Sequence, residues 1–221
     1  NAETNDFKIV IEEETGYNLD WFFDQWLYKA GCPEFDIRQQ WDQQSQSVRL
    51  TVKQTQRIDS LTGIFRTPVD IEVWVHGVHE TYRVLITQQE ETFSFPAYQQ
   101  PQLVLFDKGS WLLKKVNYQR PPEESVFQLE HARDGVDRLA AIDELQWVVD
   151  SAAVLAALGK AMLEDPFSEV RRDAVWALGD VKNTDVSEQL IKAYGDRDPR
   201  VRTASVTSLG RCRGEKVVKT L

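Results

Sequence analysis

Residues 18–35 read NLDWFFDQWLYKAGCPEF, and aromatic side chains are far denser here than in the chain as a whole, which is 10% aromatic. Asn18 is a favourable N-cap, Gly31 supplies the left-handed residue that often ends a helix, and Pro33 blocks its continuation. Apolar residues recur between these signals at helical spacing: Leu19, Phe22, Phe23, Trp26 and Leu27. The stretch therefore predicts a helix with one buried face.

This helix needs a large partner, because aromatic side chains bury large surfaces. A short helix predicted over 7–15, ending at Gly16, offers only four apolar side chains as cover: Phe7, Ile9, Val10 and Ile11. The stretch therefore indicates that the chain is the C-terminal part of a larger protein. The alternative is an ordinary core helix of a self-contained domain, and periodicity does not separate the two.

The composition is that of an ordinary soluble protein of one or two domains, with 221 residues, 42% hydrophobic and 28% charged. No apolar run approaches the ~20 residues of a membrane span, and no secretory signal is recognised. The chain starts at Asn1, as an excised piece would, so its localisation stays open. The net charge is −9, of which residues 165–221 contribute +2 and the preceding part −11. Because nucleic acid is negatively charged, the acidic part of the chain before residue 165 argues against nucleic acid as the main partner.

After Pro33 the hydrophobic period changes from 3.6 to 2, which predicts strands in place of helices. Turn signals lie at 42–47, at Gly77 and at 107–110. Between them we expect seven short strands, at 34–41, 48–52, 69–75, 82–86, 93–95, 103–106 and 112–116. This spacing predicts a seven-stranded antiparallel β-sandwich over residues 33–118, with Trp74 on its polar face.

Residues 119–125 are expected to be a linker, because Pro121 and Pro122 favour extended backbone. The segment after it repeats itself: 170–179 aligns with 201–210 at a period of 31, and 138–145 fits as a degenerate earlier copy. This period predicts an α-solenoid over residues 126–221. The expected buried positions are Ala174, Val175, Leu178, Ser205, Val206 and Leu209. The units resemble short bacterial HEAT-type repeats, which share the Val-Arg-x-x-Ala-x-x-x-Leu-Gly helix.

A search for catalytic motifs finds no His-Glu-x-x-His helix, no phosphate-binding loop and no Gly-x-Ser-x-Gly elbow. The three histidines, His76, His79 and His131, form no ligand set, and Cys32 and Cys212 are expected to be buried free thiols. We therefore predict no catalytic, cofactor-binding or metal-binding residue. Six arginines near the repeat helix ends are expected to bridge neighbouring repeats and not to bind an anion: Arg171, Arg172, Arg200, Arg202, Arg211 and Arg213.

The order of these segments resembles the C-terminal part of aminopeptidase N-type zinc metallopeptidases, a gluzincin family. The resemblance is carried by Trp21–Tyr28, Gly31–Pro33, Val52–Gln56, Phe65–Val69 and Phe106–Lys115. Tyr17-Asn18-Leu19 stands where Gly-x-Leu is common in the family, and Cys32 where His is frequent. The resemblance implies that residues 1–32 are the terminal helices of an otherwise absent thermolysin-like catalytic domain.

The resemblance also implies a function. The longer parent would be a zinc aminopeptidase acting on peptides, while this chain would hold no zinc and be inactive. Its helical domain would cap the catalytic domain and shape substrate access. The alternative is a protein-interaction scaffold on the repeats of a noncatalytic relative. A third hypothesis is carbohydrate binding through Trp41, Trp74 and Trp111.

Overall fold

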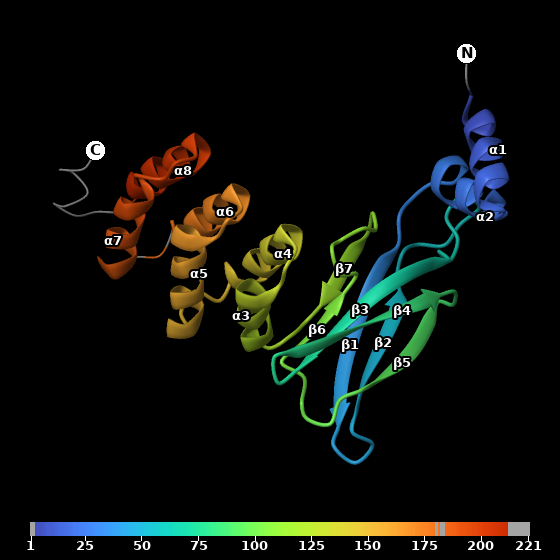
Figure 1. The fold of residues 1–221 in the computed structure, drawn as a ribbon, viewed down its shortest axis with the longest axis horizontal. Coiled ribbons are helices and arrows are strands. Elements are labelled where there is room, and N and C mark those ends of the chain that lie inside the picture. The colour runs from blue at the N-terminus through green and yellow to red at the C-terminus, as the bar shows by residue number, and fades with distance from the viewer. Residues whose placement is uncertain (1–2, 180, 182–183, 212–221) are drawn as a thin grey trace. The chain divides into compact units, whose positions relative to one another are not determined.

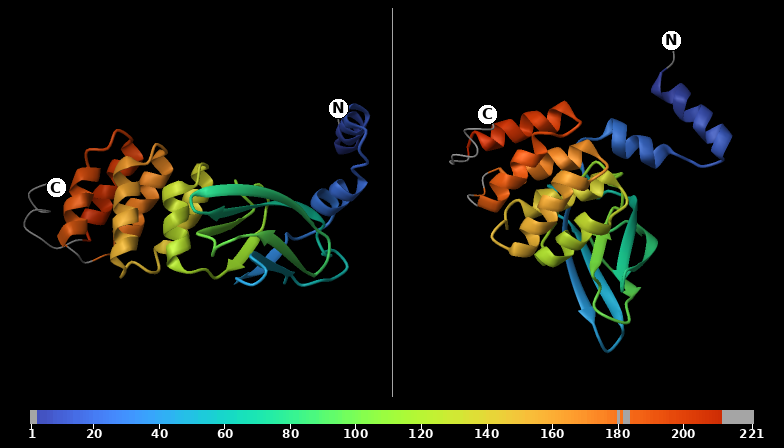
Figure 2. Two further views of the ribbon diagram at one scale, coloured as in Figure 1. Left: turned by 60° about the horizontal axis from the view of Figure 1, so that its bottom comes forward. Right: turned by 60° about the vertical axis from the view of Figure 1, so that its left-hand side comes forward.

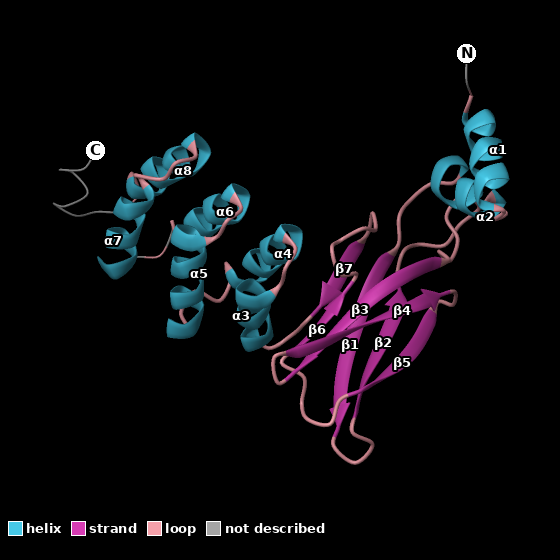
Figure 3. Ribbon diagram, in the orientation of Figure 1, coloured by secondary structure: helices cyan, strands magenta, loops and turns pink. Residues whose placement is uncertain are grey.

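The computed structural model describes residues 3–179, 181 and 184–211, the side chains of 184 and 185 excepted (Figure 1). The chain divides into two compact units. The first comprises residues 1–70, 82–98 and 112–119, and the second comprises residues 71–81, 99–111 and 120–221. Helices and two small sheets make the fold a mixture of α and β structure (Figure 3). Within the described residues no helix is long and apolar enough to cross a membrane.

The first unit begins with three helical segments: α1 (Thr4–Thr15), α2 (Asp20–Phe23) and the π-helix η1 (Asp24–Tyr28). As predicted, α1 ends at Gly16, which adopts the left-handed conformation with φ 71°. The predicted N-cap at Asn18 is wrong by one residue, since α2 begins after Leu19. The amide of Leu19 donates to the Glu12 carboxylate at 2.6 Å, which fixes Leu19 at the helix entrance.

A four-stranded sheet follows in the order β5-β2-β1-β7, formed by β1 (Glu34–Asp42), β2 (Ser47–Gln54), β5 (Glu90–Pro96) and β7 (Lys115–Tyr118). Strand β1 is antiparallel to β2 but parallel to β7, so the all-antiparallel prediction is wrong at this pair. The reason is topological: β7 follows β6 (Leu103–Phe106) of the other sheet and does not return to β1 through a hairpin. Val48, Leu50 and Val52 of β2 alternate inward as predicted and are buried, and Phe35 and Ile37 of β1 are buried beside them.

The second sheet has the order β4-β3-β6, formed by β3 (Thr67–Val75), β4 (Val78–Ile86) and β6 (Leu103–Phe106). The prediction that Trp74 lies on a polar face is wrong, because this side chain is only 6% exposed. Its ring packs edge-on against Phe127 of the helix α3 (Pro122–His131), and its indole N–H donates to the Glu72 carboxylate at 2.7 Å. A helix therefore covers the face that alternation assigned to solvent.

The described residues of the second unit also form six helices: α3 (Pro122–His131), α4 (Gly135–Leu145), α5 (Ala152–Glu164), α6 (Ser168–Leu178), α7 (Thr184–Ala193) and α8 (Pro199–Leu209). Helices α3, α5 and α7 form one layer and α4, α6 and α8 the other, each helix packing on the next of its layer (Figure 2). The expected linker is already helical from Pro122, because proline suits the first turn, where a helix lacks amide partners.

The repeat alignment predicted the helix core at five of its six positions. Ala174, Val175, Leu178, Ser205 and Leu209 are all buried. Val206 is 38% exposed, so its predicted burial is wrong. Val175 is covered by the next repeat, whose Ser208 hydroxyl donates to its carbonyl, whereas no further helix follows α8 within the described residues to cover Val206.

The prediction of buried free thiols can be compared with the structure at only one of the two cysteines. Cys32 is a free thiol, but it is half-buried and not buried as expected. It lies in the short connection from η1 to β1, where few neighbours cover it. Cys212 lies outside the described residues.

Candidate functional site

The helical segments of the first unit expose large apolar side chains. We call five of them the exposed helical set: Phe7 (62% exposed), Val10 (56%), Phe22 (40%), Leu27 (49%) and Tyr28 (63%). The stripe predicted to be buried is thus only partly covered, with Phe23 buried and Leu19 and Trp26 half-buried. Large apolar side chains gathered on one short segment indicate an interaction site.

The helices are nevertheless anchored to their own unit. Trp26 lies 5.3 Å from Phe65, centroid to centroid, and Phe7 lies 6.4 Å from Phe23. The Gln25 side chain pairs with the backbone of Arg66, accepting its amide at 2.7 Å and donating to its carbonyl at 3.0 Å. The exposed helical set therefore lies on a segment that packs against the rest of its unit.

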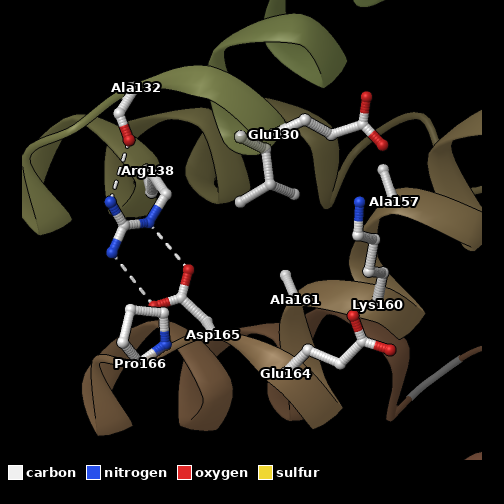
Figure 4. Close-up of a pocket in the computed structure, with 10 residues that line it drawn as sticks. Glu130, Ala132, Arg138, Ala157, Lys160, Ala161, Glu164, Asp165 and Pro166 are labelled. Atoms are coloured by element: carbon white, nitrogen blue, oxygen red, sulfur yellow. Dashed lines mark hydrogen bonds and ion pairs between the residues drawn. The ribbon is translucent and has the colours of Figure 1, made fainter.

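A second candidate lies in the second unit, where α3, α5 and the loops after them enclose a groove of about 270 Å³ (Figure 4). Its apolar wall consists of Leu129, Ala157, Ala161 and Pro166. Three exposed charged side chains, Glu130, Lys160 and Glu164, lie toward one end of the groove. Arg138 and Asp165 lie at the other end.

The Arg138–Asp165 pair belongs to a pattern that repeats along the helices. Nε and Nη2 of Arg138 donate to the two carboxylate oxygens of Asp165 at 2.7 and 3.0 Å, and Nη1 donates to the carbonyls of Ala132 and Arg133 at 2.9 Å. Such a two-pronged pair in a buried setting is geometrically specific. All three nitrogens of this guanidinium donate to protein acceptors, so the pair forms a fixed wall of the groove.

Arg171 repeats the arrangement one unit later. It donates to both oxygens of Asp196 at 2.7 and 2.9 Å and to the carbonyl of Asp165 at 2.8 Å. The guanidinium holds the pKa of the Asp196 carboxyl below its ordinary value. Two more predicted bridges also form between repeats: Arg200 pairs with Glu169, and Arg211 lies over the Trp176 ring at 5.8 Å. Arg172 pairs instead with its neighbour Asp173, and Arg213 lies outside the described residues.

Asp137 is a buried carboxyl of this unit whose pKa is strongly raised. Its carboxylate, 3% exposed, accepts the Gly109 amide at 3.0 and 3.1 Å and so holds the turn after β6 to the first turn of α4. Burial is the main cause that raises its pKa to about 6; Asp134 and Glu72 add to the rise, while the Gly109 amide and Lys108 oppose it. The bond to the turn indicates a structural role.

The histidines and tryptophans singled out in the sequence also have structural contacts. His79 stacks on Trp74 at 4.3 Å, and His131 stacks on Phe127 at 4.0 Å. The indole N–H of Trp41 donates to the Ala97 carbonyl at 3.0 Å, while Trp111 is 84% exposed. Since Trp74 is buried, the three tryptophans do not form an exposed carbohydrate platform. Among the described residues no group of three or more His, Cys, Asp or Glu is arranged to hold a metal ion.

Comparison with known proteins gives matches of two kinds, to a protein family and to solved structures. Residues 155–221 match the family of HEAT repeats. The match covers the last part of the predicted repeat domain, in which the arginine pattern recurs. No curated protein sequence matches the chain.

The second match is structural. The chain is similar to the crystal structure of Legionella pneumophila aminopeptidase A in complex with aspartic acid, with a TM-score of 0.69 and 13% sequence identity. The alignment covers 98% of this chain and 31% of the Legionella chain, so this chain spans about a third of that protein's length. The likeness establishes a shared fold.

The sequence predicted the helical stripe but not the groove. Two signals for the groove are nevertheless present. Ala157 and Ala161 lie four residues apart on one face of α5, which leaves space beside α3. Residues 122–165 also carry ten acidic and only three basic side chains, a net charge of −7.

Proposed function

We propose that this chain is the noncatalytic C-terminal region of a zinc-dependent, aminopeptidase-like metallopeptidase. In this proposal the two sheets form a sandwich, the HEAT repeats continue as an α-solenoid, and the helices cap a catalytic domain and shape access of peptides to it. The zinc and the catalytic residues belong to the longer parent protein. The observation that carries the proposal is the exposed helical set.

The physical argument starts from the cost of exposing these side chains. Burial of apolar surface is worth roughly 25 cal/mol per Å², so leaving Phe22 and Leu27 about half exposed forgoes on the order of 1 kcal/mol each. A covering domain recovers this energy. The fold shared with an aminopeptidase chain about three times as long supports a catalytic domain as that cover.

A protein-interaction scaffold is the second candidate. It is favoured by the match to HEAT repeats over residues 155–221 and by the acidic groove between α3 and α5. Stacked repeats present extended surfaces that commonly bind other proteins. The scaffold needs no zinc in the parent protein, and this separates the two candidates.

The test compares the protein encoded by the complete gene with the 221-residue chain. We expect the complete product to bind about one zinc ion per molecule and to release amino acids from peptide amides, with activity lost on chelation. We expect the 221-residue chain to do neither. A complete product without zinc would refute the peptidase and favour the scaffold, and zinc-dependent activity in the chain alone would refute the noncatalytic assignment.

A further inference from the structure

We infer that the groove between α3 and α5 binds a cationic side chain, Arg or Lys, presented by an extended peptide. We call it the α3–α5 groove, lined by Leu129, Glu130, Ala157, Lys160, Ala161 and Glu164, with the Arg138–Asp165 pair at one end. The inference rests on the groove itself and holds whether or not the parent protein is a peptidase.

The first support is size. At about 270 Å³ the groove is just below the range of roughly 300–1,000 Å³ typical of small-molecule sites. This volume suits one long side chain and not a whole cofactor.

The second support is the chemistry of the wall. Leu129, Ala157 and Ala161 provide an apolar surface of the kind along which Lys and Arg stems lie while their charged ends reach solvent. Glu130 and Glu164 stand at the end of this wall, one on α3 and one on α5 (Figure 4). An aliphatic stem with a terminal cation fits both parts.

The third support is charge. Arg138 and Asp165 neutralise each other in a buried pair, so the ligand meets Glu130, Glu164 and Lys160, whose charges sum to −1. The segment around them, residues 122–165, has a net charge of −7, of which Lys108 and Arg120 from outside the segment offset two charges by pairing with Asp134 and Glu144. A cation is therefore attracted to the groove, and Lys160 opposes that attraction.

A substitution of Lys160 distinguishes a cationic ligand from an anionic one. If the groove binds a cation, Lys160→Met strengthens binding, because it removes a like charge and retains the aliphatic stem. If the groove instead binds an anion, the same variant weakens binding. In the next pair of helices, α5 and α7, Leu163 occupies the position equivalent to Glu130, and Ile191 occupies the position equivalent to Lys160. These two charged side chains are therefore particular to the α3–α5 groove.

The experiment titrates the 221-residue chain with the peptide acetyl-Gly-Arg-Gly-amide and follows backbone amide shifts of α3 and α5 by NMR. The matched peptide has norleucine in place of Arg, which keeps the stem and removes the charge. We expect saturable shifts with the Arg peptide, at least tenfold weaker binding of the norleucine peptide, and weakening with added salt. Equal binding of the two peptides, or no saturable shift at any peptide concentration up to 10 mM, overturns the inference.

Matched variants locate the site. Glu130→Gln with Glu164→Gln should weaken the Arg peptide about tenfold, whereas Glu123→Gln, exposed on the same helix but outside the groove, should not. Ala161→Leu should block the groove, while Ala156→Leu, exposed on the same helix, should leave binding unchanged. Unchanged binding in the double glutamine variant, or weaker binding in Lys160→Met, overturns the inference.

Discussion

Replacing Asp137 with asparagine should stabilise the protein at neutral pH and lose most of that effect in acid. The carboxylate is buried between the turn after β6 and the first turn of α4, with its pKa raised to about 6. A raised pKa means that the folded state holds the proton more tightly than the unfolded state. The contribution to stability is therefore fully present below the unfolded pKa and is lost as the pH rises through about 6.

The size of the effect follows from the two pKa values. Between the ordinary value of 3.8 and about 6, each pKa unit is worth about 1.4 kcal/mol. Ionisation of Asp137 thus costs about 3 kcal/mol of stability at pH 7.5 and less than about 1 kcal/mol at pH 4.0. Asparagine keeps a carbonyl oxygen for the Gly109 amide but carries no charge. Its advantage over the wild type should therefore fall by about 2 kcal/mol from pH 7.5 to pH 4.0.

The assay is urea unfolding followed by circular dichroism at the two pH values, which lie on either side of the isoelectric point near 4.9. Asp150→Asn, at an exposed position after α4, serves as the control and should match the wild type at both. A variant at Asp137 that is destabilised at pH 7.5, or whose effect is the same at both pH values, would refute the reasoning. In that case the carboxylate would be held by favourable charge interactions and not penalised by burial.

Two further substitutions test the contacts of the second unit. Arg171→Ala should destabilise it by about 3–5 kcal/mol, because Asp196 is left as a buried charge without its partner. Arg172→Ala breaks a half-exposed pair with Asp173 and should cost less than about 1 kcal/mol. Thermal unfolding of both variants gives the comparison, and equal losses of stability would contradict it. Trp74→Phe should cost about 1–3 kcal/mol because the buried Glu72 carboxylate loses the indole donor, and denaturant unfolding with no change of midpoint would contradict this.

Much of the fold was predictable because the hydrophobic period changes where the structure changes. The alternation in residues 48–52 predicted β2, the short apolar run over 103–106 predicted β6, and the repeated Val-Arg helix predicted α6 and α8. The errors lie where a distant segment decides burial. Trp74 is buried because Phe127, some fifty residues later, packs on it, and alternation within a strand carries no such information.

The candidate sites differ in how far the sequence predicts them. The stripe over residues 19–27 is visible as a periodic pattern, but only the structure distinguishes the buried Phe23 from the exposed Phe22 and Leu27. The groove depends on two helices, α3 and α5, that contribute Glu130 and Glu164 from positions more than thirty residues apart. A single-helix pattern does not predict such a pairing.

The exposed helical set offers the most direct test of the central claim, that a catalytic domain covers it in the parent protein. Hydrogen–deuterium exchange of residues 20–28 is measured in the protein encoded by the complete gene and in the 221-residue chain. We predict at least tenfold slower exchange in the complete protein, lost in the double variant Phe22→Asp with Leu27→Asp. Leu113→Asp, at a position 72% exposed in the same unit, should retain the protection. Equal exchange in the complete protein and the chain would contradict the claim.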